Sequence, residues 1–175
     1  ITSFTADSST SNSGTANLTT KVGGGTIDIG NSTTGAYSLT GLSGNDTLKG
    51  NGNADIINGG GGDDNIDGRG GNDEINAGAG DDIITVSSAG QGDGDTIDGG
   101  SGTDTLSLSS GSHAFATDAK LQNINSITLA STSTVIDLTG QTESLTITGG
   151  AQADTITAGS GCLLYTSPSP RDGFT

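Results

Sequence analysis

The sequence predicts an all-β fold, a β-solenoid of short stacked strands, and three observations lead to this prediction. A nine-residue unit repeats seven times between residues 41 and 107. Each unit carries glycine in its first half and one apolar residue at its eighth place. Leu, Ile, Val and Phe together make up just under a fifth of the chain, so a regular repeat must supply the order that a large apolar core cannot.

Two places of the unit are the same in every copy. The eighth place is always Leu or Ile, and the sixth is always aspartate: Asp46, Asp55, Asp64, Asp73, Asp82, Asp95 and Asp104. A four-residue insertion at 86–89 separates the fifth unit from the sixth. We expect this insertion to disturb the stacking and to shift the register of Asp95 and Asp104.

The remaining places have a physical explanation as well. Glycine lets the backbone adopt a positive φ and turn tightly. Asn53 replaces a fourth-place glycine, and we expect it in a left-handed conformation, which asparagine tolerates. The apolar eighth place between more polar neighbours predicts a very short strand with one face inward. Stacked at the ~4.8 Å spacing of strands, these side chains would form continuous ladders.

Two units, or 18 residues, would form one coil with a turn at each edge. Asp46, Asp64 and Asp82 would then line one edge, and Asp55 and Asp73 the other. Carboxylates ~5 Å apart repel each other by roughly 3 kcal/mol per pair at an effective dielectric constant of 20. Several Ca²⁺ ions between adjacent coils would remove this repulsion, because carboxylate and carbonyl oxygens are the ligands that calcium prefers. We therefore expect folding and calcium binding to be one event.

The charge distribution supports a cation and argues against other partners. The net charge is −15, and the stretch 41–107 carries −11 of it, with only Lys49 and Arg69 as bases. Such an acidic surface repels nucleic acid and anionic lipid. No apolar run approaches the roughly 18 residues of a membrane-spanning helix, so we expect neither nucleic-acid binding nor membrane insertion.

The units resemble the RTX (repeats-in-toxin) nonapeptide, Gly-Gly-x-Gly-x-Asp-x-apolar-x, most closely at 59–67, 68–76 and 99–107. The resemblance implies a parallel β-roll with calcium-binding turns and export from a bacterium by a one-step secretion system. It implies that the metal ligands are the sixth-place aspartates and turn carbonyls, namely Asp46, Asp55, Asp64, Asp73, Asp82, Asp95, Asp104 and Asp154 with the carbonyls of Gly60, Gly62, Gly71 and Gly80. Expected glycines are replaced by Leu42, Asn51, Asn53 and Ala77 among others, and together with the insertion these departures weaken the prediction for Asp55 and Asp95.

The flanking segments read as parts of the same solenoid. Residues 1–40 form a Ser/Thr-rich lead-in, part linker and part coil. Residues 108–161 continue the solenoid without calcium until a second calcium-binding block starts at 149–157, with Asp154 at its sixth place. Residues 162–175 hold Cys162 and both prolines; this tail resembles translated read-through of a sequencing adapter, so we predict that it is not native.

The leading hypothesis is a non-catalytic, calcium-binding β-roll module of a larger secreted or cell-surface bacterial protein, such as an adhesin, that folds at the ~mM calcium found outside cells. Any surface ligand is left open. His113, the single histidine, is expected at the surface, and neither a zinc-hydrolase histidine pair nor a Gly-x-Ser-x-Gly motif is present. The additional acids Asp63, Asp67, Asp81 and Asp98 are expected to be solvated charges.

Two alternatives remain from the sequence. The chain is the C-terminal module of an exported protease or lipase whose catalytic domain is absent, or it carries an outward threonine array, such as Thr146 and Thr148, that binds ice or another surface.

Overall fold

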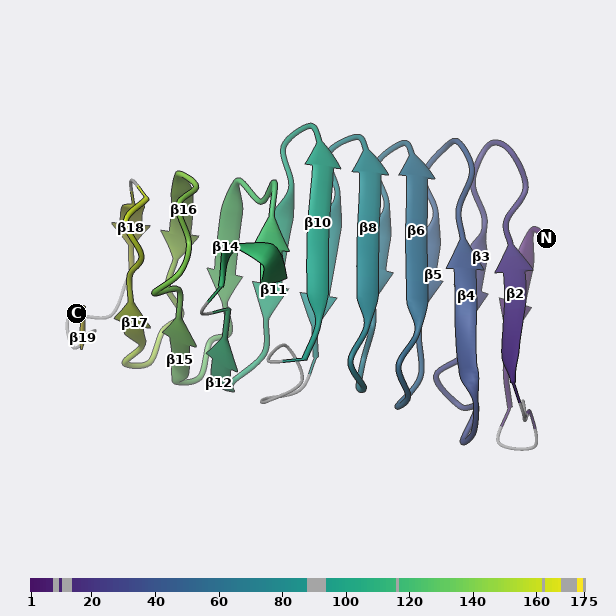
Figure 1. Ribbon diagram of the computed structural model, residues 1–175, viewed down its shortest axis with the longest axis horizontal. Helices are drawn as coiled ribbons and strands as arrows, with labels where there is room; N and C mark the ends of the chain where they lie inside the picture. Colours follow the sequence, from purple (N-terminus) through teal and green to yellow (C-terminus); the bar gives the residue numbers. More distant parts are fainter. Residues whose placement is uncertain are drawn as a thin grey trace.

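The computed structural model describes residues 1–7, 10, 14–87, 94–115, 117–161, 163–167 and 173–174. The described chain is a parallel β-solenoid that winds from the N-terminus to the C-terminus along one long axis (Figure 1). Every pairing among the described strands joins parallel neighbours one coil apart. This confirms the all-β fold and the parallel solenoid.

One long sheet runs the length of the solenoid. Its strands, in spatial order, are β1 (Ser3–Thr5), β3 (Thr26–Asp28), β5 (Thr47–Lys49), β7 (Asn65–Asp67), β9 (Ile83–Val86), β11 (Thr105–Leu108), β14 (Ser126–Leu129), β16 (Leu145–Thr148) and β18 (Leu163–Thr166).

Two further sheets share the opposite face. The second sheet contains β2 (Thr15–Thr19), β4 (Ala36–Thr40), β6 (Ile56–Gly61), β8 (Glu74–Ala79), β10 (Thr96–Ser101) and β13 (Leu121–Gln122). The third contains β12 (Gly111–Ala114), β15 (Thr134–Asp137), β17 (Thr155–Thr157) and β19 (Gly173–Phe174). A short 3₁₀ helix, η1 (Asp118–Lys120), precedes β13.

The strand register confirms that two units form one coil. Leu48 pairs with Ile66, and Ile66 with Ile84, at steps of 18 residues. Across the insertion, Ile84 pairs with Leu106, a step of 22 residues. The expectation that the insertion disturbs stacking is therefore wrong, because the strands that follow the insertion pair in register with those of the coil before it. Lengthening the connection between two strands costs little closure entropy.

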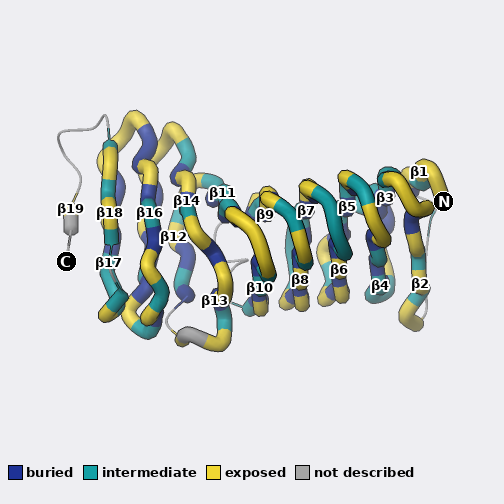
Figure 2. Tube along the Cα trace, turned by 90° about the horizontal axis from the view of Figure 1, so that it is seen from above, coloured by how far each residue is buried: buried dark blue, intermediate teal, exposed yellow. Residues whose placement is uncertain are grey.

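The core is a narrow file of apolar side chains between the facing sheets, and burial alternates along the strands (Figure 2). The eighth-place residues are at most 2% exposed and form the predicted ladders: Leu48, Ile57, Ile66, Ile75, Ile84, Ile97 and Leu106. A single inward side chain per unit suffices because each one packs against its counterparts in the coils before and after it.

The lead-in and the continuation belong to the same stack. β1 pairs with β3 and β2 with β4, and β14 pairs with β11, so the residues after 107 stack directly on the calcium-repeat block. Cys162, 168–172 and Thr175 of the predicted non-native tail lie outside the described residues. The described part of that tail places β18 beside β16, and its origin stays a prediction.

His113 is buried, and the prediction that it lies at the surface is wrong. It is 2% exposed and pairs in register with Ile136 of β15, because β12 opens the third sheet and alternate residues of that strand face inward. Its Nε2 lies 3.0 Å from the carbonyl oxygen of Ser109.

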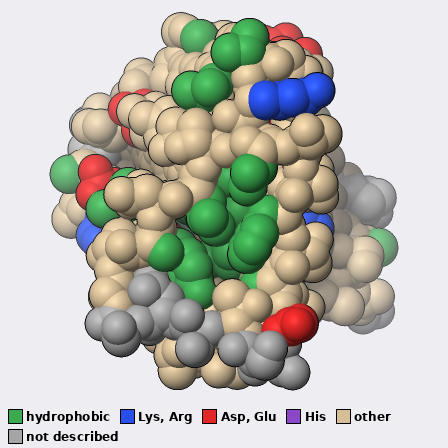
Figure 3. Space-filling model, turned by 90° about the vertical axis from the view of Figure 1, so that its right-hand side faces the viewer, with side chains coloured by type: hydrophobic (Ala, Val, Ile, Leu, Met, Phe, Trp, Pro, Cys, Tyr) green, Lys and Arg blue, Asp and Glu red, His purple; other side chains and the backbone are tan. Residues whose placement is uncertain are grey.

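The N-terminal end of the solenoid leaves the core partly open. Figure 3 looks along the axis at this end and shows hydrophobic side chains gathered near its centre. Phe4 of β1, with Ala16 and Leu18 of β2, is only partly buried there. Over the described stretches, no helix has the length and apolar character needed to cross a membrane.

Candidate metal centres in the turns

The solenoid sorts the sixth-place aspartates into two edges. The first edge holds Asp46, Asp64, Asp82 and Asp104, each immediately before a strand of the long sheet. The second edge holds Asp55, Asp73 and Asp95, each immediately before a strand of the second sheet. Asp154 lies before β17 of the third sheet. The division of the first five aspartates between two edges is the predicted one.

These carboxylates point inward and form hydrogen-bonded files along each edge. All eight are at most 3% exposed. On the first edge, the backbone N–H of Asp46 donates to Oδ1 of Asp64 (2.7 Å), and that of Asp64 to Oδ1 of Asp82 (2.7 Å). Each carboxylate therefore holds the start of the strand one coil before it.

The same contact continues across the insertion. The N–H of Asp82 donates to Oδ1 of Asp104 at 3.0 Å. On the second edge, the N–H of Asp55 donates to Oδ1 of Asp73, and that of Asp73 to Oδ1 of Asp95, both at 2.8 Å. The expected register shift of Asp95 and Asp104 is thus a second error, for the reason given above for the strands.

The other carboxylate oxygen, Oδ2, is the unusual atom of the site. Within the described chain, Oδ2 of Asp64, Asp73, Asp82 and Asp104 is buried and has no hydrogen-bond partner. A buried polar oxygen without a partner is costly, and an ionised one more so. A bound cation would supply the missing partner.

The first-place residues shape the space beside this oxygen. A Cβ built on Gly59 would lie 2.4 Å from Oδ2 of Asp64 and 2.3 Å from the carbonyl oxygen of Ala77 in the next coil. Glycine therefore leaves open a small space that a carboxylate oxygen and a backbone carbonyl oxygen both border. Two hard oxygens of this kind suit Ca²⁺.

Burial raises the pKa of these aspartates. Desolvation is the largest cause and takes the pKa of Asp64 to about 6; the N–H of Asp46 lowers it, and the charges of Asp82 and Asp46 raise it. Desolvation likewise takes the pKa of Asp73 to about 8, with Asp55 N–H opposing it and the charges of Asp95 and Asp55 adding to it. The pKa values of Asp55, Asp82 and Asp104 are also raised, first by burial.

The predicted turn carbonyls lie close to the next coil where the described contacts place them. Gly60 O lies 2.2 Å from a Cβ built on Gly78, and Gly62 O lies 2.3 Å from one built on Gly80. Gly80 O faces the turn at Gly102 in the same way. In the part of the chain that is described, no three Asp, Glu, His or Cys side chains converge on one point, so an ion here would need these backbone oxygens besides the carboxylates.

The fourth place of the second edge departs from the prediction. Gly71 has a φ of 124°, but Asn53 is not among the residues with positive φ. The expected left-handed conformation of Asn53 is therefore wrong. The backbone N–H and Nδ2 of Asn53 instead donate to Oδ1 of Asn51 at 2.8 and 3.1 Å. This local turn, closed by the Asn51 side chain, competes with the left-handed backbone conformation of Asn53.

A second file of acceptors runs along the outside of the first edge, and sequence reasoning missed it. Fifth-place side chains accept from the next coil: the N–H of Asp63 donates to Oδ1 of Asn45 (3.0 Å), and that of Asp81 to Oδ1 of Asp63 (3.0 Å). Asp63 and Asp81 are exposed as expected, yet each also orders a neighbouring turn. Recurrence of Asn or Asp at the fifth place was the available signal.

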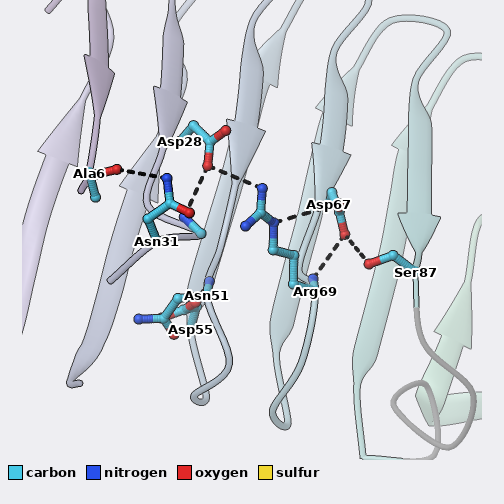
Figure 4. A network of polar contacts seen from close by, with 9 residues as sticks. Ala6, Asp28, Asn31, Asn51, Asp55, Asp67, Arg69 and Ser87 are labelled. Carbon is cyan, nitrogen blue, oxygen red and sulfur yellow. Dashed lines mark hydrogen bonds and ion pairs between the residues drawn. The ribbon is translucent and has the colours of Figure 1, made fainter. Parts of the chain in front are cut away.

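Arg69 supplies a positive charge of the protein's own beside the second edge (Figure 4). Its guanidinium NH2 lies 3.3 Å from Oδ1 of Asp28, and its Nε 3.9 Å from Oδ2 of Asp67. Ser87 Oγ donates to Oδ1 of Asp67 at 3.0 Å. Asp67 is therefore half-buried and bound to Arg69 and Ser87, and it is not simply a solvated charge. Asp98 is also half-buried, and its Oδ1 accepts a hydrogen bond from Asn123 Nδ2 at 2.7 Å.

Comparison with known proteins follows the same repeats. A family model described as the RTX calcium-binding nonapeptide repeat matches in four copies, at residues 33–66, 58–88, 89–112 and 146–161. Together these spans cover more than half of the chain and include every sixth-place aspartate named above. No curated protein and no solved structure matches the chain.

Proposed function

The chain belongs to the RTX calcium-binding nonapeptide repeat family, and on this premise we propose that it binds several Ca²⁺ ions between adjacent coils and folds when it does so. The proposed ligands come from among the sixth-place aspartates and the turn carbonyls. The observation that carries the proposal is the set of buried Oδ2 atoms that lack a hydrogen bond in the described chain, at Asp64, Asp73, Asp82 and Asp104.

The arrangement explains why binding and folding would be coupled. In the folded chain, the files bring carboxylates of successive coils together and remove them from water, and both effects raise their pKa values. In the extended chain these charges are separated and hydrated. Bound calcium would supply the compensating positive charge, so the free energy of binding contributes directly to folding.

The fold assigns distinct tasks to the residues around each ion. The carboxylates provide negative charge at a fixed depth, because a backbone N–H of the neighbouring coil holds Oδ1. The glycines bring carbonyl oxygens close to the next coil. The eighth-place ladders hold the strands on which both turns depend. This is a structural role, and we propose no catalytic one.

Circular dichroism of the full chain tests the proposal. We expect a largely unordered spectrum in chelator and a β-rich one at about 5 mM Ca²⁺, a level above the weak end of extracellular affinities. Mg²⁺ at the same concentration is the control, because it demands octahedral geometry and dehydrates reluctantly. A spectrum that is β-rich in chelator and unmoved by calcium would contradict the coupling.

We further propose that the chain acts outside a bacterial cell as a module of a larger secreted or surface-attached protein. Free calcium at ~mM outside cells fits sites of this class. The complete reading frame tests this proposal: more Thr/Ser-rich solenoid would support an adhesin or surface-layer protein. A His-Glu-x-x-His or Gly-x-Ser-x-Gly motif would instead indicate an exported enzyme.

A further inference from the structure

The second place of each unit divides the turns into two kinds. In three turns its backbone N–H donates to Oδ2 of the aspartate four residues later. The distances are 3.3 Å from Leu42 to Asp46, 2.8 Å from Asn51 to Asp55 and 2.9 Å from Gly150 to Asp154. None of these second-place residues has a positive φ. We name these three the closed turns.

The other kind has the opposite backbone conformation at the second place. The φ values are 101° at Gly60, 68° at Arg69, 112° at Gly78 and 90° at Gly100. Their aspartates carry the Oδ2 atoms for which the described residues provide no hydrogen bond: Asp64, Asp73, Asp82 and Asp104. We name these four the open turns.

The two features have one geometric cause. Rotation about the N–Cα bond of the second-place residue changes the direction of its N–H relative to the rest of the turn. At negative φ the N–H points at Oδ2, and at positive φ it does not. The sign of φ at one residue therefore decides whether the carboxylate is satisfied by the protein itself.

This difference decides where a cation is favoured. In a closed turn both carboxylate oxygens accept hydrogen bonds from backbone N–H groups. The amide hydrogen that donates to Oδ2 carries a partial positive charge and occupies the side from which a cation would approach. In an open turn Oδ2 is buried and bare. We infer that the open turns at Asp64, Asp73, Asp82 and Asp104 hold calcium, whereas the closed turns at Asp46, Asp55 and Asp154 are completed by backbone N–H groups without an ion.

The division does not follow the glycine pattern of the repeat. Arg69 replaces the expected glycine, yet its turn is open; Gly150 is the expected glycine, yet its turn is closed. Asp95 belongs to neither kind, because its second-place residue, Gln91, lies outside the described residues. The inference rests on the proposed function and specifies which of the eight aspartates carry it out.

Counting bound calcium ions by native mass spectrometry of the full chain tests the inference. Asp64→Asn and Asp82→Asn alter open turns, and Asp46→Asn and Asp55→Asn are the matched changes in closed turns. We expect each open-turn variant to hold fewer ions than the wild type, and each closed-turn variant to hold the wild-type number. Equal losses in the two groups would overturn the inference.

A gain of binding provides a second measurement, independent of variants that fold poorly. Leu42→Gly allows the second place to adopt a positive φ and should open the turn at Asp46, whereas Leu42→Ala strongly disfavours it. Leu42 is 42% exposed, so neither change removes much core. We expect one more ion in Leu42→Gly than in Leu42→Ala, and equal numbers would overturn the inference. A wild type that binds no calcium would refute the proposed function itself, whereas a loaded wild type without these differences would refute the inference alone.

Discussion

The calcium-repeat block, 41–107, and the continuation, 108–161, share one long sheet but hold their coils together differently. In the block, a strand such as β7 buries a single apolar side chain, Ile66. In the continuation, β14 buries Ile127 and Leu129, and β16 buries Leu145 and Ile147. At about 25 cal/mol per Å² of buried apolar surface, the second pattern stabilises each coil more without any ion.

The turns differ in the same sense. Where the first edge passes into the continuation, the N–H of Asp104 donates to Oδ1 of Asn125 at 2.6 Å, so a neutral amide takes the place of the next aspartate. Farther on, Nε2 of Gln141 donates to the carbonyls of Phe115 and Thr117 at 2.8 and 2.9 Å. One solenoid thus combines coils with buried carboxylate oxygens that have no hydrogen-bond partner among the described residues with coils that rely on buried apolar area and amides.

Calcium removal should produce the largest difference between the two regions. In chelator we expect amide protection to be lost across β5 to β10 and retained in β14 to β17, because only the block loses binding free energy on removal of the ion. Hydrogen exchange with mass spectrometry, with and without calcium, measures both regions in one sample. Simultaneous loss of protection in both would show that the solenoid is one cooperative unit and would break the comparison.

Cavities in the core should separate the regions by their response to calcium. Ile66→Ala and Ile147→Ala each remove a fully buried side chain from the long sheet and should cost about 2–5 kcal/mol. Once the sites are saturated, a further tenfold rise in free calcium should increase the free energy of unfolding of Ile66→Ala by about 1.4 kcal/mol per site. The same rise should leave that of Ile147→Ala unchanged. Urea denaturation at two calcium concentrations measures this; equal recovery in the two variants would contradict it.

Acidification should act in opposite directions with and without calcium. The folded-state pKa values of Asp64 and Asp73, about 6 and about 8, exceed the ordinary 3.8, so the calcium-free folded block binds more protons than the unfolded chain. Its stability therefore rises as the pH falls from 8 toward 4, by about 1.4 kcal/mol for each unit of raised pKa that is crossed. With calcium bound, protons compete for the same oxygens, and acid should destabilise.

Circular dichroism between pH 8 and pH 5, on calcium-free and calcium-loaded protein, measures this reversal. Asp73→Asn is the control and should flatten the calcium-free response. A calcium-free chain that gained no β structure between pH 8 and pH 5 would contradict the protonation of these carboxylates in the folded state.

The smallest effect is expected at the junction of the two regions. Asn125→Asp adds a carboxylate next to Asp104 and should destabilise the calcium-free protein by up to about 1 kcal/mol, since the side chain is exposed. Calcium should reverse this loss. Asn125→Ala removes the acceptor without adding charge, so calcium should not restore its stability. Thermal melting of the two variants at low and high calcium distinguishes them.

The sequence by itself determined the coil, the two edges and the ladders, because each depends on a residue that recurs at a fixed interval. An aspartate and an apolar residue two places after it, such as Asp64 and Ile66, occur again every 18 residues, and the strands pair at the same 18-residue step. The four-residue insertion at 86–89 left that pairing in register, since a longer connection between strands costs little closure entropy.

Only the tertiary structure decided the features that depend on a single torsion or on a distant neighbour. The burial of His113 follows from its pairing with β15, and the contact of Arg69 with Asp28 joins residues 41 positions apart. The closure of a turn depends on the φ of its second-place residue, which neither Arg69 nor Gly150 reveals by its identity. A repeat specifies which atoms can reach a site, whereas local backbone geometry determines whether a hydrogen bond already occupies them.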